Sequence, residues 1–202
     1  MSRRVNMNRE RNKEYTKRKI IESAIELFSI QDYQKTSLEE ISKKAGVTKT
    51  TFFAYFKTKE ELLYDFDLEQ LKVFEQRMEL CVKDSQELLS KLREAIVDMA
   101  KNLHKTRIIT QNLIHLGTIS PVYKKLLSEI FNILPRIMYK TIQHGQEIGV
   151  ITKNISPMII GENLVKIYIG VIVQWSFLDE ANKDLAEVMD DTIKNYISGI
   201  EG

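Results

Sequence analysis

The stretch TSLEEISKKAGVTKTTFFAYFKTKEEL, residues 36–62, decides the fold of this chain. It contains two short helical patterns separated by a turn at Gly46. Overlapping capping-box patterns begin at Thr36 and Ser37 and predict the start of the first helix. Gly46 predicts its end, and Thr48 can cap the second helix. Two short helices joined by a tight glycine-containing turn are typical of a helix-turn-helix.

The apolar residues of this stretch are spaced to pack both helices against a preceding helix near residues 16–29. That packing leaves Lys49, Thr50, Thr51 and Tyr55 pointing outward. Lysine can donate to guanine, and threonine can bond a base edge or touch a thymine methyl. The pattern therefore favours DNA binding over its alternative, a compact helical corner with a solvated face.

The charge of the chain is unevenly distributed. Residues 1–60 carry a net charge of +6 and the remaining residues −4. A basic first portion on an acidic body suggests that only the first portion meets a polyanion. The alternative is that its first basic residues form a solvated tail. These residues are Arg3, Arg4, Arg9, Arg11, Lys13, Lys17, Arg18 and Lys19.

The rest of the chain also reads as helix, because apolar residues recur at spacings of three and four almost throughout. We predict an all-α protein of about nine helices, with a break at Gly117 and a bend at Pro135, a proline inside a helix. The expected domains are a basic arm with a three-helix helix-turn-helix domain, residues 1–60, and a helical regulatory and dimerisation domain, residues 61–202. The expected helices beyond the first domain span residues 58–83, 85–105, 107–116, 120–145, 156–178 and 183–198.

Composition sets further bounds. The chain has 202 residues, 43% of them hydrophobic, and one cysteine. That composition predicts a globular protein in a reducing, cytoplasmic setting. The longest near-apolar run, residues 167–173, is much shorter than the roughly 20 residues that span a bilayer, so we expect no membrane partner.

No pattern in the sequence indicates a catalytic, cofactor or metal site. His104 and His115 would lie about 16 Å apart along one helix, too far to share a metal. His144 has no ligand partner at convincing spacing. Cys81 continues an apolar stripe and is predicted to be a core residue rather than a nucleophile or redox sensor. We therefore expect no enzyme activity.

Residues 16–62 resemble the DNA-binding domain of the tetracycline-repressor (TetR) family of bacterial transcriptional regulators. The likeness follows the sequence nearly residue for residue from IIESAIELF, residues 20–28, to the end of the helix-turn-helix. It implies that Ser37 contacts a phosphate with Thr36 beside it as a cap, and that Lys59 binds another phosphate. The implied DNA-binding residues are Thr36, Ser37, Thr48, Lys49, Thr50, Thr51, Tyr55 and Lys59.

Three positions depart from that family's pattern. Thr50 replaces a frequent glycine and adds a side chain that faces the groove. Phe53 replaces a tyrosine whose hydroxyl donates to a phosphate, so that contact should be missing. Asp32 replaces a turn glycine, and aspartate tolerates a left-handed backbone better than most residues.

The remainder resembles the family's regulatory domain more loosely, most clearly at residues 145–151 and 170–178. The resemblance implies a homodimer through the last two helices. The helix at 156–178 is apolar on several sides, which agrees with burial against both its own core and a partner; its alternative is a helix central to a monomer. The expected interface residues are Ile160, Leu164, Ile167, Val171, Trp175, Ile193, Tyr196 and Ile197.

Large flexible and aromatic side chains, three of them near Pro135, are candidates to line an adaptable apolar pocket between the five helices expected over residues 58–178. The alternative, which is favoured for each residue taken singly, is an ordinary core position. The expected pocket residues are Met99, Leu103, His104, Leu113, Phe131, Met138 and Tyr139.

The sequence thus predicts a dimeric repressor that binds a pseudopalindromic operator in double-stranded DNA and is released by a small apolar or amphipathic molecule. Within this class, a regulator that activates, or one that takes no ligand, remains open. The alternative from another class is a helical enzyme or a protein-interaction module whose first domain no longer binds DNA.

Overall fold

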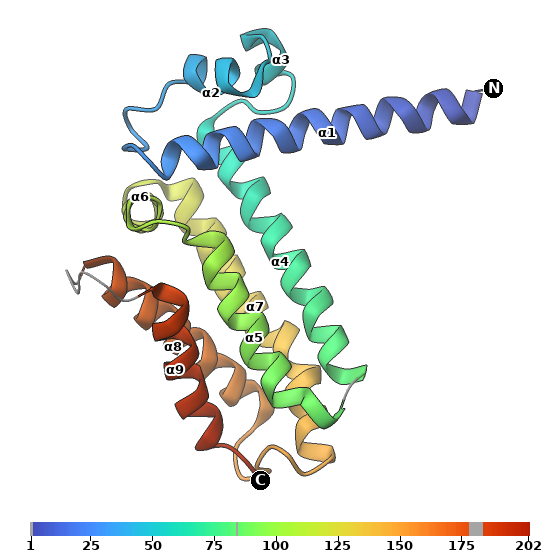
Figure 1. Cartoon of the computed structure of the whole chain (residues 1–202), viewed down its shortest axis with the longest axis vertical. Helices are drawn as coiled ribbons and strands as arrows, with labels where there is room; N and C mark the ends of the chain where they lie inside the picture. The colour runs from blue at the N-terminus through green and yellow to red at the C-terminus, as the bar shows by residue number, and fades with distance from the viewer. Residues whose placement is uncertain (1, 84, 178–183) are drawn as a thin grey trace.

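The computed structural model describes residues 2–83, 85–177 and 184–202 and is helical almost throughout (Figure 1). The helices are α1 (Ser2–Phe28), α2 (Leu38–Ala45), α3 (Lys49–Phe53), α4 (Lys59–Lys83), α5 (Leu88–Leu103), α6 (Arg107–Ile119), α7 (Pro121–Glu147), α8 (Pro157–Phe177) and α9 (Leu185–Ser198), with a 3₁₀ turn at Ser85–Glu87. In the described part of the chain the one β-type pairing is an isolated bridge between Ile151 and Glu201. The predicted all-α class is confirmed.

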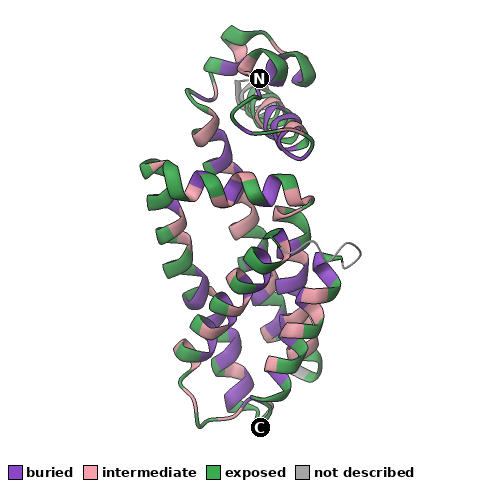
Figure 2. Cartoon of the chain, turned by 90° about the vertical axis from the view of Figure 1, so that its left-hand side faces the viewer, coloured by how far each residue is buried: buried purple, intermediate pink, exposed green. Residues whose placement is uncertain are grey.

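The helices form a small head and an elongated body (Figure 1). We use "head" for α1 to α3 and "body" for α5 and α7 to α9. Helix α4 begins in the head and runs down one side of the body. Helix α6 lies across the long axis at the junction of the two, as the perpendicular view also shows (Figure 2).

Two apolar cores hold these parts together. The head core is not confined to the head: Ile109 and Leu113 of α6 and Tyr123 of α7 belong to it. The body core joins α4, α5, α7, α8 and α9. Helix α4 crosses the expected boundary at residue 60 and contributes to both cores, so the head and body share packing there.

Helix α1 is longer than predicted. Its 27 residues include most of the segment that the sequence suggested as a tail, and its first half projects beyond α2 and α3 (Figure 1). Arg9, Arg11 and Lys13 are exposed on it. The side chains of Arg3 and Arg4 lie outside the described part of the chain.

The predicted break at Gly117 is wrong, because α6 continues to Ile119. A Cβ atom on Gly117 would lie 2.7 Å from a Leu127 methyl carbon, so the glycine permits close packing against α7. The chain turns instead at Ser120, whose hydroxyl accepts a hydrogen bond from the Tyr123 N–H, with Pro121 in the first helical position. That start was predicted correctly.

Helix α7 continues through Pro135. Next to it, α8 carries Gly161, where a Cβ would lie 3.1 Å from the Pro135 carbonyl oxygen. The missing side chain therefore lets α8 approach α7 at the proline.

Helix α8 as a whole, with 21 residues, is long and apolar enough to cross a membrane by length and composition, although its longest near-apolar run is short. One such helix is weak support for a membrane span, because the core helix of a soluble protein meets the same criterion. Here Ile160, Leu164 and Tyr168 of α8 pack into the body core.

Candidate DNA-binding surface and ligand cavity

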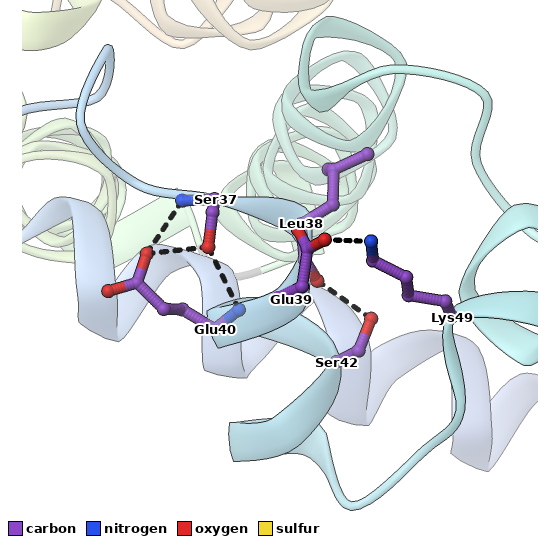
Figure 3. A network of polar contacts seen from close by, with 6 residues as sticks. All are labelled: Ser37, Leu38, Glu39, Glu40, Ser42 and Lys49. Carbon is purple, nitrogen blue, oxygen red and sulfur yellow. Dashed lines mark hydrogen bonds and ion pairs between the residues drawn. The ribbon is translucent and has the colours of Figure 1, made fainter.

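The helix-turn-helix begins with a capping box at Ser37 (Figure 3). The Ser37 hydroxyl accepts a hydrogen bond from the Glu40 N–H, and the Ser37 N–H donates to the Glu40 carboxylate at 2.7 Å. These hydrogen bonds hold the pKa of Glu40 below its usual value. Since the Ser37 hydroxyl also donates to this carboxylate at 2.8 Å, its proton is already engaged within the head.

The turn and α3 follow the predicted local chemistry. Gly46 ends α2 with a φ of 63°, in the left-handed region where glycine carries no steric penalty. Thr48 caps α3: its hydroxyl accepts from the Thr51 N–H at 3.1 Å and lies 2.9 Å from the Thr51 hydroxyl. Thr48 and Thr51 therefore shape α3 as well as lying near its exposed face.

The outer face of α3 presents Lys49, Thr50 and Phe53, all exposed, with Tyr55 half-buried just beyond it. The Lys49 ammonium forms an ion pair with Glu39 of α2 (Figure 3). The predicted groove-facing cation is thus held by an acidic side chain of the neighbouring helix.

Two residues of the predicted DNA-binding set, Thr36 and Lys59, have structural roles. Thr36 is buried, so its side chain is not on the DNA-facing surface. The Lys59 ammonium donates to the carbonyl oxygens of Tyr33 and Thr36 at 2.6 and 2.9 Å and lies 4.2 Å from the centre of the Tyr33 ring. Burial lowers the pKa of Lys59. Through these two hydrogen bonds, Lys59 at the start of α4 stabilises the turn between α1 and α2.

Helix α6 is bonded to the same turn. The Asn112 side-chain amide donates to the carbonyl oxygens of Phe28 and Gln31, and its oxygen accepts from the Tyr33 N–H. Thr106 adds a hydrogen bond from its hydroxyl to the Ser29 carbonyl at 2.8 Å. The sequence analysis missed this link, for which residue spacing alone offers no signal.

The body contains an apolar cavity of about 140 Å³ below α6. Helices α4 to α8 all contribute to its wall. Five predicted pocket residues line it: Met99, Leu103, His104, Leu113 and Phe131. Met138 instead lines a neighbouring cavity of about 10 Å³, and Tyr139 lines neither. The cavity lies on the N-terminal side of Pro135 along α7, so the expected grouping around the proline is only partly present.

The cavity wall also contains polar groups that the sequence analysis missed. Asp67 of α4 accepts a hydrogen bond at 2.8 Å from the Tyr123 hydroxyl, and Tyr168 of α8 lines the same space. His104 lies with its ring centre 6.3 Å from that of Tyr168, and burial lowers the pKa of His104 to about 4. A signal for Asp67 was present, since it lies four residues after Leu63 on the apolar face of α4.

The remaining candidates for chemistry are the single cysteine and the possible metal ligands. Cys81 is buried in the body core, and burial raises the pKa of its thiol to about 11, which makes the reactive thiolate scarce. Across the described residues, no group of three or more His, Cys, Asp and Glu side chains could hold a metal ion.

Most of the expected dimer residues belong to the chain's own core. Ile160, Leu164, Val171, Ile193 and Ile197 are buried within the single chain, whereas Ile167, Trp175 and Tyr196 are partly exposed. The residues of α8 that face away from the chain's own core mostly precede these buried residues by one position, and we call them the outward stripe. It consists of Ile159, Asn163, Lys166, Ile167, Gly170, Val173, Gln174 and Phe177.

An exposed short helix supported by a capped partner, set on a basic head above a helical body, defines the class of helix-turn-helix DNA-binding regulators. Comparison with known proteins agrees. The sequence model described as "Bacterial regulatory proteins, tetR family" matches residues 20–65. The match covers α2, α3 and the adjoining parts of α1 and α4, so these residues form a DNA-binding domain of this family's type. The protein is a DNA-binding transcriptional regulator.

Individual relatives match over most of the chain. The fatty acid metabolism regulator protein of Bacillus subtilis (strain 168) is 27% identical over 187 residues, which cover 90% of this chain and 93% of the relative. The Thermus thermophilus FadR repressor, solved with lauroyl-CoA, is 23% identical with a TM-score of 0.64, covering 91% and 94% of the two chains. A putative regulator from Saccharomonospora viridis, solved with choline, is 18% identical with a TM-score of 0.72, covering 94% and 99%. These two structures show the shared fold.

Proposed function

We propose that this protein is a cytoplasmic repressor that binds a pseudopalindromic operator as a homodimer and leaves it when a small molecule fills the body cavity. The observation that carries the proposal is the hydrogen bond between the Asn112 side chain of α6 and the Tyr33 backbone in the turn between α1 and α2. Helix α6, which holds Asn112, also places Leu113 and Ile114 in the wall of the cavity. One helix therefore touches both the proposed ligand and the proposed DNA-binding unit.

The exposed face of α3 supports direct reading of bases. Lys49, Thr50 and Thr51 lie at the start of this helix, with Tyr55 after its end. The net charge of +6 on residues 1–60 favours approach to the phosphate backbone. Ser37 remains close to the surface, where its N-terminal position on α2 suits a phosphate. Lys59 acts chiefly by holding the turn beside these groups.

The outward stripe of α8 supports pairing with a second copy. Ile159, Val173 and Phe177 are 49%, 37% and 67% exposed, although all three are large and apolar. Between them, Gly170 has open space where a Cβ would stand, which lets another helix approach closely. The buried residues first expected at the interface support this stripe from behind.

Release requires a ligand that binds the DNA-incompetent arrangement more tightly than the competent one. A molecule in the cavity would press on Leu113 and shift α6, and Asn112 would carry that shift to the turn before α2. Small-molecule complexes are seen in relatives of this fold, with lauroyl-CoA in one and choline in another. Helix α4, which spans head and body, offers a second route.

The test is a gel-shift titration with the DNA upstream of the protein's own coding sequence. We expect one salt-sensitive, dimer-sized complex on a two-fold symmetric site. Salt-independent binding, or an operator without symmetry, would contradict the proposal. The alternative of an enzyme or interaction module would be supported by failure to bind any DNA, and the match to this family's DNA-binding domain does not favour it.

A further inference from the structure

The cavity contains a buried acid for which the described residues provide no counter-charge. Asp67 is 7% exposed, and its carboxyl accepts a hydrogen bond from the Tyr123 hydroxyl. The described residues that line the cavity include no lysine or arginine. Burying a carboxylate without a cation is costly, so a retained acid in an apolar wall needs an explanation.

A second unpaired group lies in the same wall. The Tyr168 hydroxyl is buried and, among the described residues, has no hydrogen-bond partner, although most buried hydroxyls have one. Burial, with a smaller effect of the negative charge of Asp67, raises the pKa of Tyr168. Asp67 and Tyr168 both line the cavity. One carboxylate and one hydroxyl oxygen are therefore both able to accept hydrogen bonds beside the cavity.

We propose that the cavity selects a small apolar amine, whose ammonium group binds between Asp67 and Tyr168 while its apolar body fills the rest of the space. An ammonium supplies both the missing positive charge and several N–H donors. The remaining wall is apolar, with Leu113, Ile130 and Ile172 among its residues. This inference rests on the proposed role of the cavity as the effector site.

The size of the cavity limits the apolar body. A space of about 140 Å³ is close to the roughly 150 Å³ of an engineered cavity that holds benzene. One ring with a short side chain matches this volume.

The state of the acid supports the same class of ligand. Burial raises the pKa of Asp67 to about 7, against a smaller opposing effect of the Tyr123 hydrogen bond. The carboxyl is thus near balance between its neutral and charged forms at neutral pH. A bound cation would shift it to the charged form, whereas a bound carboxylate would oppose that form.

The experiment compares three probes of similar size by calorimetry on the full chain, without DNA: 2-phenylethylamine, 2-phenylethanol and 3-phenylpropanoate. We expect the amine to bind at least about tenfold more tightly than the alcohol, as a charge-assisted hydrogen bond implies, and the anion to bind most weakly. Equal or tighter binding of the anion, or no binding of the amine at millimolar concentration, would overturn the inference.

Variants locate the effect. Asp67→Asn keeps the shape of the side chain and should abolish the preference for the amine while leaving alcohol binding within about threefold. Tyr168→Phe should weaken amine binding more than alcohol binding and serves if Asp67→Asn does not fold. The matched control is Asp65→Asn, which removes a charge from the same helix outside the cavity, where Asp65 pairs with Lys17. A preference for the amine that persists in both cavity variants would refute the assigned site.

Operator release is measured separately, so the two proposals can fail independently. If the amine binds through Asp67 but leaves the DNA complex intact, the ligand assignment stands and the effector role fails. If the alcohol or the anion releases DNA and the amine does not, the effector role stands and the ligand assignment fails.

Discussion

The side-chain oxygen of Asn112 accepts a hydrogen bond from the backbone N–H of Tyr33 at 3.2 Å, although the two residues are 79 positions apart in the chain. The bond crosses from α6, beside the cavity, to the turn that precedes the helix-turn-helix. The position of the head is thus tied to a helix that lines the cavity and not only to the continuous α4.

Asn112→Ala should remove the side-chain hydrogen bonds between α6 and the turn before α2. Removing the side chain leaves the carbonyls of Phe28 and Gln31 without their donor, so we expect a loss of about 1–3 kcal/mol in the free energy of unfolding. Operator affinity without ligand should change less than the ligand concentration needed for release. Urea unfolding and gel-shift titrations measure the two effects, with Gln111→Ala, which breaks the bond of α6 to α8, as the comparison. Normal release by Asn112→Ala protein would exclude α6 as the route.

Lys49 and Lys59 should differ in their effects on DNA binding. Lys49→Ala should change which bases are preferred, because Lys49 lies on the exposed face of α3. Lys59→Ala should weaken binding to all sequences about equally, and it should also lower the melting temperature, since the Lys59 ammonium bonds two backbone carbonyls. Binding across a salt series and thermal unfolding separate these effects. A Lys59→Ala protein of unchanged melting temperature would contradict the structural role.

Phe53→Tyr should strengthen DNA binding. Phe53 is 51% exposed on α3, so an added hydroxyl has room to meet a phosphate. One net hydrogen bond corresponds to a gain of about two- to tenfold in affinity. Fluorescence anisotropy with operator and with unrelated DNA checks this, and an equal gain on both is expected because phosphates carry no sequence information. Weaker binding would indicate that the bare ring contacts a base.

Asp67 should make the protein less stable as the pH rises from about 4 to 7. Its pKa is raised from 3.8 to about 7 in the folded chain, so the folded form holds a proton that the unfolded form has already released. Stability therefore falls through this interval, by at most about 4 kcal/mol, and is constant above it. Urea unfolding of wild type and Asp67→Asn at pH 5 and 8 measures the difference, with exposed Asp191→Asn as control.

The titratable groups around the Asp67 carboxyl do not obscure its effect on stability. Tyr123 and Tyr168 have pKa values raised above the usual range, and burial lowers the pKa of His104 to about 4, so none of the three titrates in the folded state between pH 5 and 8. Unfolded His104 titrates near its ordinary pKa of about 6.5, but this contribution is common to wild type and Asp67→Asn and cancels in the comparison. Parallel stability curves for wild type and Asp67→Asn would show that the acid is not buried in solution.

Ile159→Glu should separate the dimer without unfolding the chain. Ile159 lies on the outward stripe of α8 and is 49% exposed, so a carboxylate there is solvated in a monomer but buried without a partner in a dimer. Sedimentation should show monomers with a nearly unchanged melting temperature. Val171→Glu places the charge inside the body core and should unfold the protein, so it is the contrasting variant. A wild-type protein that is monomeric at micromolar concentration would refute the interface.

The sequence predicted the helix-turn-helix well because its signals are local. Ser37, Gly46 and Thr48 act within one turn of their own helices, and the structure uses them as expected. Gly117 was misread because its reason lies in Leu127 of another helix. Most of the α8 residues expected at the interface are buried within the single chain, because periodicity shows that a side is apolar and does not show what covers it. Asp67 and Tyr168 come together only through packing between α4 and α8.

The unbroken course of α1 bears on how much DNA the protein can cover. A loose basic tail could fold back into the groove next to the recognition helix. A helix cannot, because each residue advances it by a fixed rise of about 1.5 Å, so Arg9, Arg11 and Lys13 hold their charges at fixed intervals along one line. Arg9 and Arg11 can therefore meet only phosphates that lie along that line. The footprint on the operator becomes a matter of rigid geometry, and shortening α1 by whole turns should shrink the protected segment in steps instead of loosening its edges.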